Sequence, residues 1–301
     1  MAIKPYLQLV RLPNLFTAAA DPLAGWLVAT GTLATPGRWV PLVAASVLIY
    51  AGGIVLNDVF DIEIDRGERP NRPLPAGRVS FRLAAWSGGL MLGCGPVVAA
   101  LSGSWTSALV AGLLALCVLA YDGGLKRTLL GPVVMGACRS LNLLLGLSQL
   151  PDFGGRYAWL TAGSYGLFVV GVTVISRSEV ESGRRRGIAL GSLIQVVAFA
   201  GLLAGFGQLA TQSYGPRPTI RFADWGECVW IAAVNVVLAF DLRAIIFPTP
   251  EQTQRAVKTA VLSLVWLDVA IVGGVQGWLP SLTVAALWVP AFLLARWLYS
   301  T

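Results

Sequence analysis

The sequence predicts an all-α protein that crosses a lipid bilayer many times, and three observations support this fold class. Of its 301 residues, 56% are hydrophobic and only 12% are charged, whereas about a quarter of an ordinary soluble domain is charged. Apolar stretches close to the roughly 20 residues that a helix needs to cross a membrane recur along the whole chain. No polar linker separates two halves. We therefore expect a single integral membrane domain over residues 1–301.

Hydropathy divides the chain into nine or ten spans. The last two expected spans are separated by little more than Gly277-Trp278, which leaves both numbers of crossings open. The expected spans lie near residues 14–31, 39–57, 83–102, 105–121, 130–150, 157–175, 188–208, 226–247, 258–277 and 279–299.

The distribution of basic residues predicts that the N-terminus lies in the cytoplasm. In that orientation most lysines and arginines, including those of 66–82 and 184–186, fall on the cytoplasmic side, as the positive-inside rule requires. Anionic lipid headgroups account for many of these charges. The net charge of +7 therefore does not indicate nucleic acid as a partner, because the chain has very little soluble surface.

The residue types that are absent or scattered exclude several chemistries. The chain has no histidine, which removes the commonest general base and the commonest transition-metal ligand. Its four cysteines form no Cys-x-x-Cys pair, and each lies in an apolar stretch, as small buried residues do. Haem sites, zinc sites and Ser-His-Asp catalysis are therefore not expected.

The most informative segment follows the second span and contains three aspartates. Asp61 and Asp65 follow Asp58 by three and seven residues, which places all three on one face of a helix. Carboxylates that converge repel one another unless a cation joins them, and Mg²⁺ takes oxygen ligands and is often shared with a substrate's phosphates. We therefore predict that these side chains hold Mg²⁺ and, with Asn57, form a diphosphate site at the membrane face. The alternative is an ordinary charged loop with Asp–Arg pairs.

Two loops on the same side of the membrane supply candidate phosphate ligands. The helix that carries the aspartates is expected to end before Pro70, and residues 71–75 then predict a stiff, extended segment that includes Arg72. Lys126 and Arg127 follow the fourth span. The compact ammonium of lysine and the planar guanidinium of arginine can both donate hydrogen bonds to phosphate oxygens. The alternative is that they only flank a span and help to orient it.

Polar residues within a span and in a third loop complete the candidate set. Arg139 and Asn142 are three apart and share a helical face, so we expect them to line a cavity beneath the aspartates. In the loop after the sixth span, Glu179 and Glu181 are two apart and would face nearly opposite sides of a helix. Both can face one site only if this segment is not helical.

These motifs resemble those of the UbiA superfamily of intramembrane prenyltransferases. Residues 57–65, with the pattern Asn-Asp-x-x-Asp-x-x-x-Asp, match its first aspartate-rich motif. Residues 71–77, Asn-Arg-Pro-Leu-Pro-x-Gly, match the usual continuation of that motif. Residues 121–127 resemble the next diphosphate-binding segment, and residues 11–14 resemble the start of the first helix.

The resemblance implies a helical bundle, typically of nine spans, around a central cavity with a cytoplasmic cap of short loop helices. It also implies Mg²⁺-dependent transfer of a prenyl group from an isoprenyl diphosphate to an aromatic or other small acceptor within the membrane. Metal and basic side chains stabilise charge on a leaving diphosphate, and this requires no histidine. The implied catalytic residues are Asp58, Asp61, Asp65 and Glu179, and the implied substrate-binding residues are Asn57, Arg72, Lys126, Arg127, Arg139 and Asn142.

One departure from the family pattern leaves a second function open. The family's second motif has two aspartates four apart after the sixth span, but the corresponding positions here are Glu179 and Gly183. The alternative is therefore a non-catalytic member that binds or helps to move an isoprenoid or another hydrophobic metabolite. The local sequence resembles a divergent bacterial, EboC-like branch, which would place the protein in the bacterial inner membrane. The oligomeric state, the prenyl chain length and the identity of the acceptor stay open.

Overall fold

The computed structural model describes residues 4–150, 153, 155–178, 184–214 and 225–299, and all regular secondary structure in these ranges is helical. The all-α class predicted from the sequence is therefore confirmed. The helices are α1 (Lys4–Leu9), α2 (Leu12–Thr30), α3 (Pro36–Phe60), α4 (Ile62–Glu68), α5 (Phe81–Ala100), α6 (Trp105–Asp122), the 3₁₀ helix η1 (Leu125–Arg127), α7 (Gly131–Leu147), α8 (Gly155–Arg177), α9 (Arg184–Tyr214), α10 (Trp225–Ile246), α11 (Pro250–Gln276), α12 (Trp278–Ala285) and α13 (Trp288–Tyr299).

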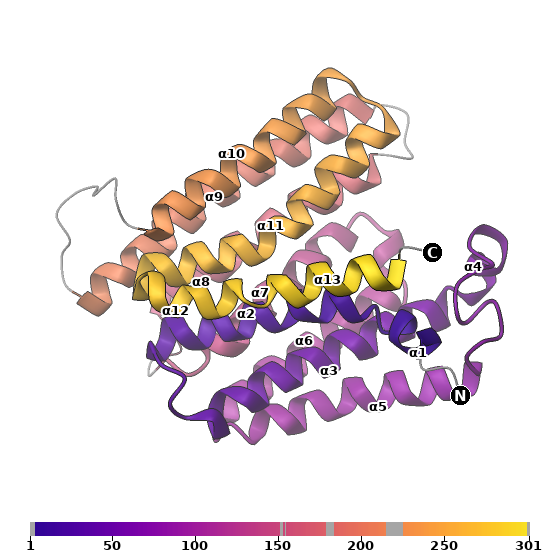
Figure 1. Ribbon diagram of the computed structural model, residues 1–301, viewed down its shortest axis with the longest axis horizontal. Helices are drawn as coiled ribbons and strands as arrows, with labels where there is room; N and C mark the ends of the chain where they lie inside the picture. Colours follow the sequence, from indigo (N-terminus) through magenta and orange to yellow (C-terminus); the bar gives the residue numbers. More distant parts are fainter. Residues whose placement is uncertain (1–3, 151–152, 154, 179–183, 215–224, 300–301) are drawn as a thin grey trace.

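The helices form a bundle in two groups with α2 between them. Figure 1 shows α9, α10 and α11 on one side and α3, α5 and α6 on the other. α2 contacts α3, α7 and α11, and most of its residues are buried. α1 and α4 lie at one end of the bundle (Figure 1), which we call the aspartate end because the segment of Asp58 to Asp65 lies there.

Among the described residues, seven helices are long and apolar enough to cross a membrane: α3, α5, α6, α8, α9, α10 and α11. α7 and the stretch Trp278–Leu294 are shorter apolar helices. Large apolar side chains on the outer faces of α5 and α6 are exposed, among them Trp86, Leu90 and Trp105. Such a surface is stable in lipid but not in water. The chain is therefore an integral membrane helical bundle, and the number of its crossings stays a prediction.

Two expected elements differ in the structure. The last expected span, 279–299, consists of two helices, and the turn between α12 and α13 falls just before Pro290, which has no N–H for a helical hydrogen bond. Residues 71–75 are not extended. They form successive turns in which the N–H of Ala76 donates to the carbonyl of Arg72, 3.0 Å away. Proline fixes only φ, near −65°, and that value suits turns as well as extended chain.

A close contact between α2 and α7 positions the interior of the site. Gly25 of α2 and Gly146 of α7 face each other, and a Cβ on either residue would collide with the backbone of the other helix. Small residues permit such an approach between membrane helices. As a result Asp21 of α2 lies beside Arg139 and Asn142 of α7.

Candidate active site

A cavity of about 290 Å³ lies between α3, α6 and α7, with Arg11 directly before α2 also in its lining, and it extends into the bundle from the aspartate end. Its wall is mainly apolar, with Ile49 and Ile54 of α3 and Leu114 and Val118 of α6 among its lining side chains. Polar side chains are found at its two ends. They are Arg11, Asn57, Tyr121 and Asp122 at the mouth, and Ser46, Arg139 and Asn142 deeper in the bundle.

The mouth of the cavity is bordered by a break in the helix that carries the three aspartates. α3 ends at Phe60, α4 begins at Ile62, and Asp61 between them has φ −96° and ψ 9°. The backbone hydrogen bonds nearly continue across the break, because the N–H of Asp65 donates to the carbonyl of Asp61 at 2.8 Å. The helix ends at Glu68, before Pro70, as the sequence predicts.

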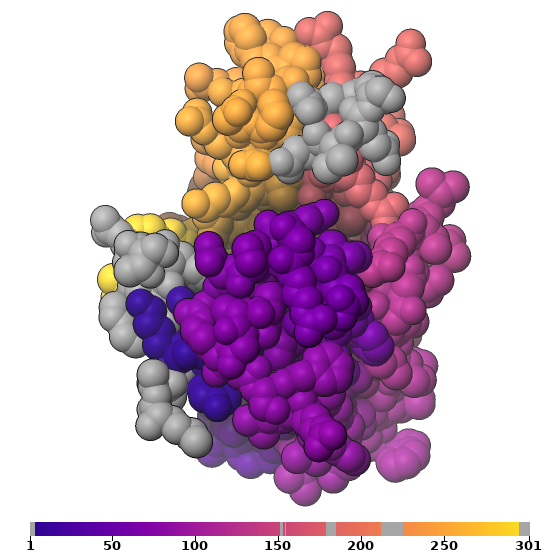
Figure 2. Space-filling model, turned by 90° about the vertical axis from the view of Figure 1, so that its right-hand side faces the viewer, coloured from indigo at the N-terminus to yellow at the C-terminus, as the bar shows by residue number. Residues whose placement is uncertain are grey.

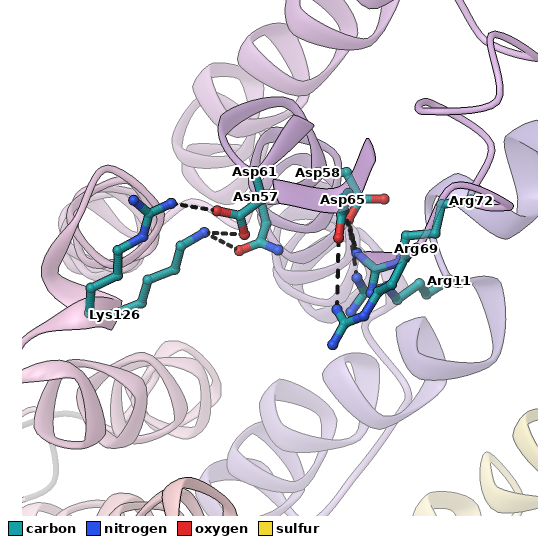
Figure 3. Close-up of polar contacts among 9 residues, drawn as sticks. Arg11, Asn57, Asp58, Asp61, Asp65, Arg69, Arg72 and Lys126 are labelled. Atoms are coloured by element: carbon teal, nitrogen blue, oxygen red, sulfur yellow. Dashed lines mark hydrogen bonds and ion pairs between the residues drawn. The ribbon is translucent and has the colours of Figure 1, made fainter. Parts of the chain in front are cut away.

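The break divides the carboxylates into two groups that point in different directions (Figure 3). Asp58 and Asp65 lie side by side, because Nη1 of Arg72 donates to both, at 3.3 Å and 2.6 Å. Asp58 also accepts from Nη2 of Arg11 at 3.1 Å, and Asp65 forms a longer ion pair with Arg69 at 3.9 Å. Both carboxylates are almost completely buried, so these contacts neutralise charge that water does not reach.

Asp61 points to the opposite side, towards η1. Its Oδ2 accepts from Nζ of Lys126 at 2.6 Å, and its Oδ1 accepts from Nη2 of Arg127 at 3.0 Å. The same Lys126 ammonium donates to Oδ1 of Asn57 at 2.8 Å. These contacts form one cluster of four candidate residues: Asn57, Asp61, Lys126 and Arg127. Asn57 is the member of this cluster that lines the cavity.

The loop that carries Lys126 is held in place by Arg177, at the end of α8. Nη1 of Arg177 donates to the carbonyl of Thr128 at 2.7 Å, and its Nη2 donates to the carbonyl of Lys126 at 2.5 Å. Gly131 makes room for this guanidinium, because a Cβ there would overlap Nη2. Arg177 was not among the predicted site residues, because its role depends on a contact between α8 and a distant loop.

The prediction that three carboxylates converge was wrong. Within the described ranges, no group of three or more Asp, Glu, His or Cys side chains is placed to hold a metal ion. Asp58 and Asp65 do lie together, as their helical spacing predicts, but the break turns Asp61 away. The donor set nevertheless suits Mg²⁺ chemically, because it consists of carboxylate and amide oxygens. In this structure the lysine and arginines form the ion pairs of these carboxylates.

A fourth carboxylate at the site, Asp122, was not singled out from the sequence. It ends α6, lines the cavity, is buried, and packs against Gly53 of α3. It interacts electrostatically with Lys126 and Asp61, but forms no ion pair among the described residues. Its position on the same side as the aspartate motif, directly after Tyr121, was the available signal.

A buried polar cluster lies beneath the cavity and includes Arg139 and Asn142. Both side chains donate to Oδ2 of Asp21, at 2.9 Å and 2.7 Å. Oδ1 of Asp21 accepts from the Tyr165 hydroxyl at 2.9 Å, and that hydroxyl also lies 3.2 Å from Oδ2 of Asp268. Arg139 is therefore held in one position at the cavity wall, with its charge neutralised inside the bundle.

Glu179, the remaining candidate, lies outside the described residues, as do Glu181 and Gly183. α8 ends at Arg177, and Ser178 is the last described residue after it. This end of α8 lies near η1, because Arg177 donates to the carbonyl of Lys126. Whether Glu179 contributes to the site stays a prediction.

The chain is similar to known proteins of one family. Residues 22–262 match the UbiA prenyltransferase family. The chain is 30% identical over 280 residues to digeranylgeranylglyceryl phosphate synthase of Methanoculleus marisnigri, covering 87% of this chain and 94% of that protein. It is 34% identical over 145 residues to the synthase of Metallosphaera sedula, where the match spans only 51% of that relative.

Two solved structures share the fold. A digeranylgeranylglyceryl phosphate synthase superposes with a TM-score of 0.67 at 19% identity, covering 91% of this chain and 98% of that one. A UbiA homologue from Aeropyrum pernix gives a TM-score of 0.58 at 17% identity, covering 87% and 96%. The relatives named here are archaeal, and the EboC-like assignment and bacterial location stay predictions.

Proposed function

Because the chain belongs to the UbiA prenyltransferase family, we propose that it transfers a prenyl group from an isoprenyl diphosphate to a small acceptor at the mouth of the cavity. The observation that carries this proposal is the cluster of Asn57, Asp61, Lys126 and Arg127 at the open end of a mainly apolar cavity. A cavity of this kind suits an isoprenoid chain, and the cluster suits its charged end.

The donor diphosphate binds by exchanging partners with the carboxylate of Asp61. Lys126 and Arg127 turn from Asp61 to the phosphate oxygens, where a point charge and a planar fork both make charge-assisted hydrogen bonds. The carboxylates that would hold Mg²⁺ are the adjacent pair Asp58 and Asp65 and, once Lys126 and Arg127 have left it, Asp61. The metal would neutralise diphosphate charge and assist its departure. Arg72 keeps Asp58 and Asp65 adjacent.

The cavity residues act on the prenyl group and the acceptor. The C1–O bond of the donor breaks, both electrons leave with the diphosphate, and the acceptor nucleophile bonds to C1. The acceptor's proton goes to Asp122, which is buried at the mouth and has no basic partner within ion-pair distance among the described residues. Arg139 and Asn142, fixed by Asp21, shape the wall along the prenyl chain.

The names of the relatives suggest the first substrates to test. We propose geranylgeranyl diphosphate as the donor and an isoprenyl glyceryl phosphate as the acceptor, with aromatic acceptors as the second class. We also propose that the aspartate end faces the cytoplasm, where soluble prenyl diphosphates are available.

The experiment uses the purified chain in neutral-lipid nanodiscs with Mg²⁺, a series of donors from geranyl to geranylgeranyl diphosphate, and both acceptor classes. We expect prenylated product and stoichiometric diphosphate release. Asp61→Asn should lower turnover at least about 100-fold, the range of losses seen when a charge-stabilising group is removed. Glu63→Gln is the matched control, because Glu63 lies in the same segment but is exposed and, among the described residues, forms its ion pair with Arg66.

Two outcomes would count against an enzyme. Folded protein that releases no diphosphate with any donor would refute transfer. If it still bound prenyl diphosphate, and Asp61→Asn kept that binding, the result would favour the non-catalytic carrier suggested by the altered second motif.

A further inference from the structure

A second hollow lies at the aspartate end, on the other side of Asp58 from the cavity. Its volume is about 430 Å³, and we call it the outer arginine pocket. Figure 2 views this end of the molecule, with α4 and the following loop in purple beside α1 in indigo. Arg11 lines both hollows and separates them. The lining residues are Gln8, Arg11, Asp58, Glu68, Arg69, Pro70, Asn71, Arg72, Pro73 and Arg78.

The outer arginine pocket carries more positive charge than its carboxylates neutralise. Four arginines line it, against Asp58 and Glu68, and Asp65 lies behind Arg72. A guanidinium has five N–H donors. The contacts given above for Arg11 and Arg72 use a single nitrogen of each, and Arg69 only approaches Asp65 at 3.9 Å with its side chain 57% exposed. The other N–H donors of these guanidinium groups are not used by these contacts and remain available to an anion.

The pocket is built from a loop whose shape is already set. Nη2 of Arg78 donates to the carbonyl of Asn71 at 2.5 Å, and the N–H of Arg78 donates to the carbonyl of Pro73 at 3.0 Å. Leu74 and Val79, which flank this turn, pack with Leu9, Val55 and Ala84 in a small apolar core. An anion that binds here therefore meets arginines that are largely preorganised.

We propose that the outer arginine pocket is the site that binds the phosphate group of the acceptor proposed above, an amphiphile with a phosphate monoester headgroup. This inference rests on the proposed prenyl transfer and assigns the acceptor a binding site of its own. Lys126, which is proposed to bind the donor, lies on the opposite side of the aspartate segment (Figure 3). Arg127 pairs with the same carboxylate, that of Asp61. A headgroup in the outer pocket lies next to Arg11, and so borders the cavity mouth where C1 of the donor would be.

The location of the pocket also suits an amphiphile. It begins at Asp58, within the last turn of α3, which is one of the helices able to cross a membrane. The end of a membrane-spanning helix is expected near the depth of the lipid headgroups. Phe60 and Ile64, on the same segment, are exposed apolar side chains, as expected where protein meets the bilayer. The phosphate would stay at the surface while the tail remains in lipid.

The test compares two anions on the full chain in neutral-lipid nanodiscs. The probes are dodecyl phosphate for the outer pocket and inorganic pyrophosphate for the donor site, measured by calorimetry. We expect Arg69→Gln with Arg78→Gln to weaken dodecyl phosphate binding about 10-fold or more, because two guanidinium groups are removed and the hydrogen bond from Arg78 to the carbonyl of Asn71 is lost. The same double variant should change pyrophosphate affinity by less than about 2-fold. Lys126→Gln should show the reverse pattern.

Arg66→Gln is the control, because Arg66 lies on α4 about one turn before Arg69, pairs with Glu63 and is not in the lining of either hollow. The proposal is overturned if Arg66→Gln weakens dodecyl phosphate as much as the double variant. It is also overturned if the double variant binds both probes normally, or loses both equally, which would make the two hollows one diphosphate site. Circular dichroism of each variant verifies folding.

Two further measurements are needed. The first distinguishes a bilayer lipid from a free phosphate as the ligand, and the second distinguishes failure of the pocket proposal from failure of the proposed prenyl transfer. Inorganic phosphate and nanodiscs with phosphatidylglycerol are added as competitors. Displacement of dodecyl phosphate by phosphatidylglycerol alone would make the pocket a bilayer-lipid site and overturn the acceptor assignment. With a turnover assay, the double variant should raise KM for a phosphorylated acceptor without changing kcat or donor KM. If no turnover is found, prenyl transfer fails while the binding arms still decide the pocket.

Discussion

Arg177 offers a direct test of how the structure positions the donor site. Its guanidinium donates to the backbone carbonyls of Lys126 and Thr128, and not to the side chains that are proposed to bind the diphosphate. Arg177→Gln removes the charge and shortens the side chain, so both hydrogen bonds are lost. Lys126 and Arg127 then have to be ordered at the moment the diphosphate binds, and affinity falls by the free energy of that ordering.

The magnitude follows from the two lost contacts. Hydrogen bonds that involve a charged group contribute about 1.5–3 kcal/mol each. Arg177 is only half-buried, and solvent screening reduces the combined value to about 1–2 kcal/mol. We therefore expect pyrophosphate affinity to fall about 5- to 30-fold. In a turnover assay the KM for the donor should rise by a similar factor, while kcat changes much less.

Gly131→Ala tests the same contact from the other side. A Cβ at residue 131 would overlap Nη2 of Arg177. The guanidinium is the flexible end of the Arg177 side chain, so it moves away from the new Cβ. Its hydrogen bonds to the carbonyls of Lys126 and Thr128 are then lost although Arg177 is still present. Both variants should therefore weaken pyrophosphate to a similar extent, and the combination should weaken it little further. Gly112→Ala, where a Cβ meets open space, is the control. If Arg177→Gln bound pyrophosphate as tightly as the unaltered chain, the positioning role would be wrong.

Three further predictions concern the interior, the metal and the orientation. Asp21→Ala leaves Arg139 without its carboxylate partner and should destabilise the bundle by about 3–5 kcal/mol. Asp21→Ala with Arg139→Met should recover part of that loss, seen as a higher thermal midpoint in detergent, and no recovery would argue against the pair. Removal of divalent ions with EDTA should abolish diphosphate release, and Mg²⁺ should restore it; release that persists after EDTA would refute metal dependence. In a chain without native cysteines, Arg66→Cys should react with an impermeant maleimide in inverted vesicles, and labelling only in right-side-out vesicles would reverse the orientation.

Helical spacing predicted part of the aspartate cluster correctly. Asp58 and Asp65 are two turns apart and do lie together, because seven residues nearly complete two turns of an α-helix. The same reasoning failed for Asp61, because the helix breaks at that residue. A spacing argument assumes an uninterrupted helix, and no proline or glycine in residues 57–65 marks the interruption.

The partners of the buried charges could not be predicted from local patterns. Arg139 and Asn142 were placed on one face by their spacing, but Asp21 binds both from a helix far away in sequence. Asp122 was visible only as the end of a span, and its place between the cavity and Lys126 depends on how α6 packs against α3. Such contacts require knowledge of which helices are neighbours.

The amino-acid sequence alone determined that this chain is an all-α membrane bundle with an acidic and basic site at one end. It did so because bilayer thickness sets the length of apolar helices, and because ionised residues concentrate outside the apolar stretches. The tertiary structure decided which cation neutralises each carboxylate, and that the arginines after α4 form a hollow separate from the cavity. Ion pairs act over a few ångströms, so the packing of distant segments selects among them.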